Sequence, residues 1–150
     1  MIIGLDTNIL CYALDPAFAE HKKTKSVVMK IIRSKDKIAM NPTIVHETYH
    51  TLVYKQKWLP DDARTKLLAF LKHSQVTFQA QTKKISLLGL KVAVNFSIGG
   101  RDSLILANLL GNRVERIYTH DDELLQLGQI SVDGQSLLIE DPISRKPKRQ

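Results

Sequence analysis

Residues 46–50 are His-Glu-Thr-Tyr-His, which matches the His-Glu-x-x-His pattern of helical zinc hydrolases. In such enzymes both histidines bind zinc from one helix face, and the glutamate acts as the general base. A catalytic zinc also needs a third protein ligand, either a later glutamate or a histidine six residues beyond the second one. No glutamate lies between Glu47 and Glu115, and position 56 is glutamine. We therefore expect Glu47 to carry the chemistry, with His46 and His50 flanking it.

Three aspartates stand where predicted helices begin. Asp6 follows the apolar run IIGL, Asp121 follows the run RIYTH, and Asp102 lies in the first turn of RDSLILANLL. Each position alone suits a helix N-cap, because an aspartate oxygen accepts hydrogen bonds from free first-turn amides. In open parallel α/β sheets, however, ligands bind outside the carboxyl ends of the strands, where the following helices also begin. The three aspartates and Glu47 are therefore candidates for one cluster.

A cluster of carboxylates has a defined chemistry. The negative charges repel one another, so the cluster persists only if cations neutralise it. Ligand sets made only of oxygen select hard ions, which here means Mg²⁺ or Mn²⁺ rather than zinc. The sequence is thus compatible with two different metal sites, a zinc site at the His-Glu-x-x-His pattern and a Mg²⁺ or Mn²⁺ site at the carboxylates. We favour the carboxylate site.

The elements that must position these acids alternate between strands and helices. A further strand is expected within a mixture of turns at 130–143, and the other strands are predicted at residues 2–5, 37–41, 76–80 and 116–120. Helices are predicted at 8–14, where Asp15-Pro16 ends the first one, and at 19–34, 43–56, 60–72, 82–96, 101–110 and 121–127. On the 43–56 helix, Val45, Tyr49 and Leu52 are expected to face the core, with Glu47 opposite them. This alternation predicts an α/β domain around a mostly parallel sheet.

Length and composition favour one domain outside the membrane. At 150 residues the chain is long enough for one substantial core, which we assign to residues 1–143. No apolar run approaches the length of a membrane span, and the N-terminal segment lacks the features of a signal peptide. The single cysteine, Cys11, fits a reducing cytoplasm.

The charge of the chain is positive. It has 22 Lys and Arg against 15 Asp and Glu, a net charge of +7, and four of the basic residues lie in a tail at 144–150 that we expect to be flexible. A surplus of this sign suits a polyanionic partner such as nucleic acid. A solvated, mildly basic surface with a solubilising tail explains the same numbers.

In combination, four short motifs resemble PIN-domain ribonucleases, and are most similar to the VapC-type toxins of toxin–antitoxin pairs. The resemblance runs from residue 2 to about residue 143. The motifs occur in the family's order: Asp6-Thr7-Asn8 after a strand, a lone Glu47, Arg101-Asp102-Ser103-Leu104-Ile105 in an apolar helix, and Thr119-His120-Asp121 after a strand.

The resemblance implies a three-layer sandwich, in which a mostly parallel sheet of about five strands lies between helices. It also implies a Mg²⁺- or Mn²⁺-dependent endoribonuclease whose metal ligands and catalytic residues are Asp6, Glu47, Asp102 and Asp121. Supporting roles are expected for Asn8, Thr119 and the additional acid Asp122, and RNA contacts for Arg101, His46 and His50. A homodimer and an antitoxin partner are further expectations from the family.

The chain departs from the family pattern at three positions. Asn108 interrupts the small residues that usually follow the helical aspartate, Asp122 adds an acid beside Asp121, and Leu124 stands where an aromatic residue is common. None of these removes a ligand.

Other functions were weighed against the same residues. A phosphatase of the haloacid-dehalogenase type would need an acid two positions after Asp6, where this chain has Asn8, and it would leave Glu47 and Asp102 without a role. A stand-alone RNA-processing nuclease and a PIN module that binds RNA or a partner without turnover remain alternatives to the toxin.

Overall fold

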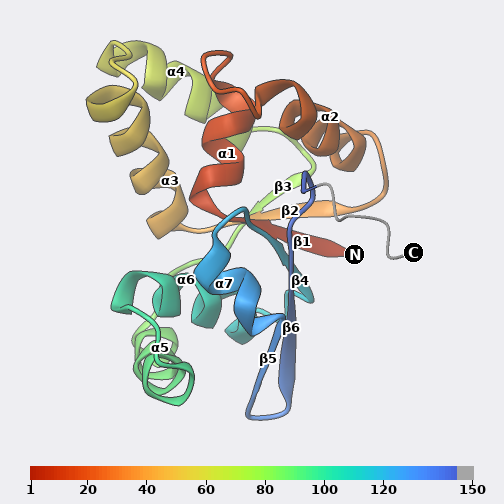
Figure 1. Cartoon of the computed structure of the whole chain (residues 1–150), viewed down its shortest axis with the longest axis vertical. Helices are drawn as coiled ribbons and strands as arrows, with labels where there is room; N and C mark the ends of the chain where they lie inside the picture. Colours follow the sequence, from red (N-terminus) through yellow and green to blue (C-terminus); the bar gives the residue numbers. More distant parts are fainter. Residues whose placement is uncertain (145–150) are drawn as a thin grey trace.

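The computed structural model describes residues 1–144, in which six strands form one sheet (Figure 1). The strand order is β3-β2-β1-β4-β6-β5, and every neighbouring pair is parallel except β5 and β6. The strands are β1 Ile2–Leu5, β2 Lys37–Met40, β3 Val76–Phe78, β4 Arg116–Tyr118, β5 Gln129–Val132 and β6 Gln135–Glu140. The predicted α/β fold around a mostly parallel sheet is confirmed. Apart from Ser144, the predicted basic tail lies outside the described residues.

Helices cover both faces of this sheet. Figure 1 shows α1 and α2 on one side of the central strands and α5 and α6 on the other. The helices are α1 Thr7–Leu14, α2 His21–Ile32, α3 Pro42–His50, α4 Pro60–Leu71, α5 Lys83–Phe96, α6 Gly100–Gly111 and α7 Asp122–Leu127, with a π-helical turn, η1, at Thr51–Lys55. No helix in the described part of the chain is both long and apolar enough to span a membrane.

The C-terminal part of the sheet is larger than predicted. Residues 130–143 were expected to hold turns and one strand, but β5 and β6 form a hairpin there. Its turn is Asp133-Gly134, and both residues have positive φ, 52° and 80°. Asp-Gly is a favoured pair for this turn, because its twist matches that of the strands. The signal was present in the sequence, and the sheet therefore has six strands instead of about five.

The close approach of α6 to the sheet depends on Gly4 in the central strand β1. A Cβ at this position would lie 2.6 Å from Leu109 Cδ1 of α6. Such a contact requires the leucine to move, so the glycine lets α6 pack directly on β1. The helix that carries Asp102 is thereby held against the strand that leads into Asp6.

The buried face of α3 differs from the prediction. Ile44, Thr48 and Leu52 are fully buried, whereas Val45 and Tyr49 are only partly covered. The prediction was right for Leu52 and partly right for Tyr49, which packs against the core, but wrong for Val45. Thr48 occupies the core face because its hydroxyl donates to the Ile44 carbonyl at 2.7 Å, which satisfies its polar group without water.

The hydrogen bonds of Asn108 explain why an asparagine stands where the family pattern has a small residue. It is fully buried on α6, and its carboxamide oxygen accepts from Asn41 Nδ2 at 3.2 Å. Its own Nδ2 donates toward the Ala80 carbonyl and the Gln81 side chain, both at 3.2 Å. Asn41 in turn caps α3 by accepting from the Ile44 amide at 3.0 Å. One buried side chain thus connects α6, the start of α3 and the loop before α5.

We predict that Asn108→Ala lowers the free energy of unfolding by about 1–3 kcal/mol, because it leaves buried polar partners without hydrogen bonds. Urea denaturation of the purified variant measures the change. Asn95→Ala is the matched control, since Asn95 is exposed on α5, and a change within about 0.5 kcal/mol is expected there. Equal stability of the two variants would show that the Asn108 network contributes little.

Candidate active site

All four predicted acids line one cleft of about 700 Å³ at the carboxyl end of the sheet. Asn8, Arg101, His46 and His50 line it as well. Thr119 is fully buried and does not line the cleft, but its hydroxyl donates to the Asp6 carboxylate. Asp122 is exposed on the first turn of α7 and is not part of the lining. The structure therefore brings together every predicted site residue except Asp122.

Asp6 is the most buried of the acids, with 6% of its surface exposed. It follows β1 and caps α1, where its Oδ1 accepts from the Thr7 amide at 2.8 Å and its Oδ2 from Thr119 Oγ1 at 2.8 Å. Burial raises the pKa of Asp6 from its ordinary 3.8 to about 6. The two hydrogen bonds lower that pKa, and the negative charges of Asp102 and Glu47 raise it further.

Asp102 lies in the first turn of α6, whose N-cap Gly99 offers no side-chain cap. The free amides and the dipole at this helix end favour a negative charge. Even so, the pKa of Asp102 is raised, first by burial and next by the charge of Asp121, while Arg101 lowers it. The pKa values of Asp6 and Asp102 are thus both raised, which means that the protein stabilises their negative charges only in part.

Glu47 reaches the cleft from α3, and 18% of its side chain is exposed. Its Oε2 accepts from Thr7 Oγ1 at 2.7 Å. Its Oε1 lies 2.9 Å from Arg101 Nε, an ion pair without the directionality of a hydrogen bond. That buried oxygen accepts no hydrogen bond from any described residue. Thr7 was not among the predicted site residues, because a threonine beside an N-cap has no distinctive sequence signal.

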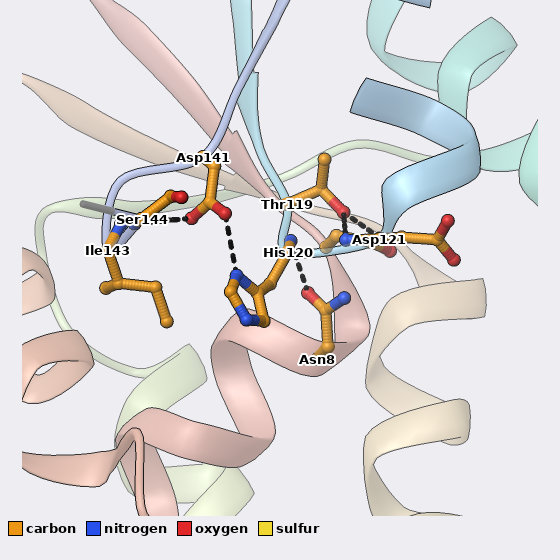
Figure 2. Close-up of polar contacts among 8 residues, drawn as sticks. Asn8, Thr119, His120, Asp121, Asp141, Ile143 and Ser144 are labelled. Atoms are coloured by element: carbon orange, nitrogen blue, oxygen red, sulfur yellow. Dashed lines mark hydrogen bonds and ion pairs between the residues drawn. The ribbon is translucent and has the colours of Figure 1, made fainter. Parts of the chain in front are cut away.

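The loop after β4 carries Asp121, which lies next to Thr119 (Figure 2). Thr119 Oγ1, which donates to Asp6, also accepts from the Asp121 amide at 3.1 Å. Asp121 Oδ1 caps α7 by accepting from the amides of Glu123 and Leu124. Its predicted capping role and its place in the cleft are thus compatible, because Oδ2 makes no hydrogen bond within the described chain.

The same loop is held from its other side by residues that sequence reasoning missed. His120 Nδ1 lies 2.7 Å from Asp141 Oδ2, and the His120 amide donates to Asn8 Oδ1 at 3.3 Å (Figure 2). Asp141 also accepts from the Ile143 and Ser144 amides. The histidine and its partner are 21 residues apart and come together only because β4 and β6 are neighbours. Asn8 therefore holds the backbone of this loop, and the supporting role that the family resemblance implies for it stays a prediction.

His46 and His50 are exposed at the side of the cleft. The His50 ring packs on Tyr54 with ring centroids 4.9 Å apart. Within residues 1–144, no three His, Cys, Asp or Glu side chains converge closely enough to form a ready metal-ligand set. The four acids share a cleft, but they are not already drawn around one point.

The donor atoms of the cleft nevertheless fit a hard divalent cation. The acidic groups offer only carboxylate oxygens, and one of these, Glu47 Oε1, is buried without a hydrogen-bond donor. Mutual repulsion and burial raise the pKa values of Asp6 and Asp102, so a cation placed among them would relieve an existing charge excess. Oxygen ligands of this kind suit Mg²⁺ or Mn²⁺.

Comparison with known families identifies the domain. Residues 3–129 match the PIN domain family model. The chain belongs to the PIN-domain family. No curated protein matches it in sequence.

Solved structures show the same fold at low sequence identity. A Mycobacterium tuberculosis VapC20, described as a Sarcin-Ricin loop cleaving toxin, is 15% identical with a TM-score of 0.70, over 84% of this chain and 95% of that chain. VapBC2 from Rickettsia felis, bound to a DNA fragment from their promoter, is 17% identical with a TM-score of 0.68, over 94% and 98%. VapBC-1 from nontypeable Haemophilus influenzae is 18% identical with a TM-score of 0.66, over 96% and 100%. This PIN-domain chain therefore has the fold found in VapC proteins.

The raised pKa of Asp6 predicts how stability depends on pH in metal-free protein. The folded state holds this proton up to about pH 6, whereas the unfolded chain loses it near pH 3.8. The unfolded state then binds fewer protons, so stability falls as pH rises between those values, by about 3 kcal/mol for a shift of this size.

We predict that Asp6→Asn removes this loss, and that in EDTA the variant melts at a higher temperature than wild type at pH 7 but not at pH 3.5. Thermal melts followed by circular dichroism at several pH values measure the difference. Asp62→Asn, an exposed change on α4, is expected to follow wild type. Parallel pH curves for Asp6→Asn and wild type would contradict the assigned origin of the loss.

Proposed function

We propose that the protein is a Mg²⁺- or Mn²⁺-dependent endoribonuclease that hydrolyses RNA phosphodiester bonds. The observation that supports this most directly is that Asp6, Glu47, Asp102 and Asp121 all line one cleft of a PIN domain. The net charge of +7 favours association with a polyanion.

We assign a different role to each group of residues in the cleft. Asp6, Asp102 and Asp121 would hold a divalent cation directly, and Glu47 would complete its surroundings at a second ion or through water. When bound, such a cation activates water as the nucleophile and neutralises charge on the leaving oxygen. Thr119 holds Asp6 and the Asp121 backbone in a fixed relation, which keeps two ligands from drifting apart under repulsion. His46, His50 and Lys55 lie where RNA would enter the cleft.

We further propose that this nuclease is the toxin of a toxin–antitoxin pair. Support comes from the fold shared with VapC proteins, two of which were solved as VapBC. An arginine of the antitoxin would pair with the carboxylates and take the place of the cation. A homodimer is also proposed, because three apolar side chains of α5, Leu87, Leu90 and Val94, are exposed in one helical row.

We predict that Asp6→Asn and Asp102→Asn each reduce RNA cleavage by at least about 100-fold, since each removes a charge that holds the cation. Cleavage of a mixed RNA pool is measured in Mg²⁺ or Mn²⁺ and again in EDTA, where wild type is also expected to be inactive. Asp62→Asn serves as the charge-matched control outside the cleft. Cleavage that survives EDTA or depends only on zinc would contradict the assignment, and metal binding without any cleavage would favour an idle PIN module.

We also predict that a small protein encoded beside this gene binds the nuclease and silences it. Co-expression of the two reading frames followed by purification tests the complex, and an arginine-to-alanine scan of the partner tests the contact with the acidic cleft. Cleavage should return when the critical arginine is removed. A lone gene whose expression leaves growth unaffected would instead indicate a stand-alone RNA-processing nuclease.

A further inference from the structure

The ion pair between Arg101 and Glu47 crosses the cleft from α6 to α3. The two partners differ in freedom: the arginine side chain is 72% exposed, and the glutamate side chain 18%. Glu47 is anchored by Thr7 through its other oxygen. The carboxylate is thus a fixed group, whereas the guanidinium is held by this contact alone among the described residues.

The contact neutralises charge without satisfying the carboxylate. Arg101 Nε lies 2.9 Å from Glu47 Oε1, yet this buried oxygen accepts no hydrogen bond within the described chain. Ion pairs with one exposed, flexible partner are weak, because solvent screens the charges and the side chain loses freedom. A divalent cation carries more charge than a guanidinium, and a cation bound beside Glu47, directly or through water, would compete with Arg101 for the same oxygen.

Only one other cation, Lys55, is found among the side chains that line the cleft in the described structure. Arg101 is adjacent to Asp102 in sequence, so release from Glu47 leaves it at the edge of the acidic site. A guanidinium presents several donors in one plane, which matches the geometry of a phosphate group.

We propose that Arg101 is an exchangeable counter-ion, which neutralises Glu47 in the metal-free protein and moves to the substrate phosphate when a divalent cation occupies the cleft. The proposal rests on the proposed nuclease function and assigns the residue two successive partners, a carboxylate and then a phosphodiester. It makes metal affinity and RNA affinity change in opposite directions when Arg101 is removed.

The experiment compares wild type with Arg101→Gln, Arg101→Lys and Lys55→Gln. Mn²⁺ binding is measured by calorimetry without RNA, and binding of a short fluorescein-labelled RNA of mixed sequence is measured by anisotropy in Mn²⁺ at low temperature. Lys55→Gln is the matched control, because it removes the same charge from the same cleft without touching the Glu47 contact. Melting curves of the metal-free variants verify that each is folded.

Arg101→Gln is expected to bind Mn²⁺ about 2- to 5-fold more tightly than wild type and RNA several-fold more weakly. Lys55→Gln should change Mn²⁺ affinity less. Arg101→Lys should resemble wild type in Mn²⁺ affinity but bind RNA less well, because an ammonium cannot match a phosphate bidentately.

The proposal is overturned if Arg101→Gln binds Mn²⁺ no more tightly than Lys55→Gln does, or if its RNA affinity equals that of wild type. Weaker Mn²⁺ binding by Arg101→Gln would overturn it as well, since Arg101 would then be positioning Glu47 for the metal. These results leave the nuclease assignment intact as long as wild type binds Mn²⁺ and cleaves RNA. Failure of wild type to do either would remove both.

Discussion

The structure around the cleft depends on the free-energy cost of keeping the buried carboxylate of Asp6 charged. Its burial raises the pKa to about 6, and the neighbouring acids add to that increase. A side chain with this pKa lowers the stability of the metal-free protein, because the free energy of unfolding falls as the pH rises from 3.8 to about 6. It is a useful choice for a cation site, since the charge excess becomes binding free energy once a cation enters.

Much of the scaffold serves to hold this unfavourable arrangement in place. Thr119 contacts Asp6 and the Asp121 backbone with one hydroxyl, and so couples the ends of β1 and β4. Gly4 leaves room for Leu109 of α6 over β1, and Asn108 connects α6 to the start of α3. The acids reach the cleft from separate elements, yet each element is fixed to another by a buried contact. Repulsion between the carboxylates therefore cannot simply be relieved by moving one helix away.

The aspartates could be predicted from the sequence because local rules place them. A carboxylate directly after an apolar strand lies at the ligand-binding edge of a parallel sheet, and Asp6 and Asp121 needed only that rule. The Asp-Gly turn of the β5–β6 hairpin carried an equally local signal, although it was not used. Contacts between distant segments had no such signal: the pairing of His120 with Asp141 depends on strand order, and that of Glu47 with Arg101 on how α3 faces α6. The buried face of α3 was misjudged for a related reason, since Thr48 satisfies its hydroxyl within the helix and can therefore occupy the core.

The orientation of α3 also determines where the residues of the His-Glu-x-x-His pattern lie. Asn41 caps this helix and is itself held by Asn108, so the rotation of α3 is set from α6. With Ile44 and Thr48 turned into the core, Glu47 faces the acidic cleft, and His46 and His50 lie exposed beside it. The three residues that form one functional group in a zinc hydrolase all line the cleft here, but Glu47 is partly buried and held by Thr7, whereas the histidines are exposed. The glutamate shares the cleft with the aspartates, and the imidazoles lie exposed at its side.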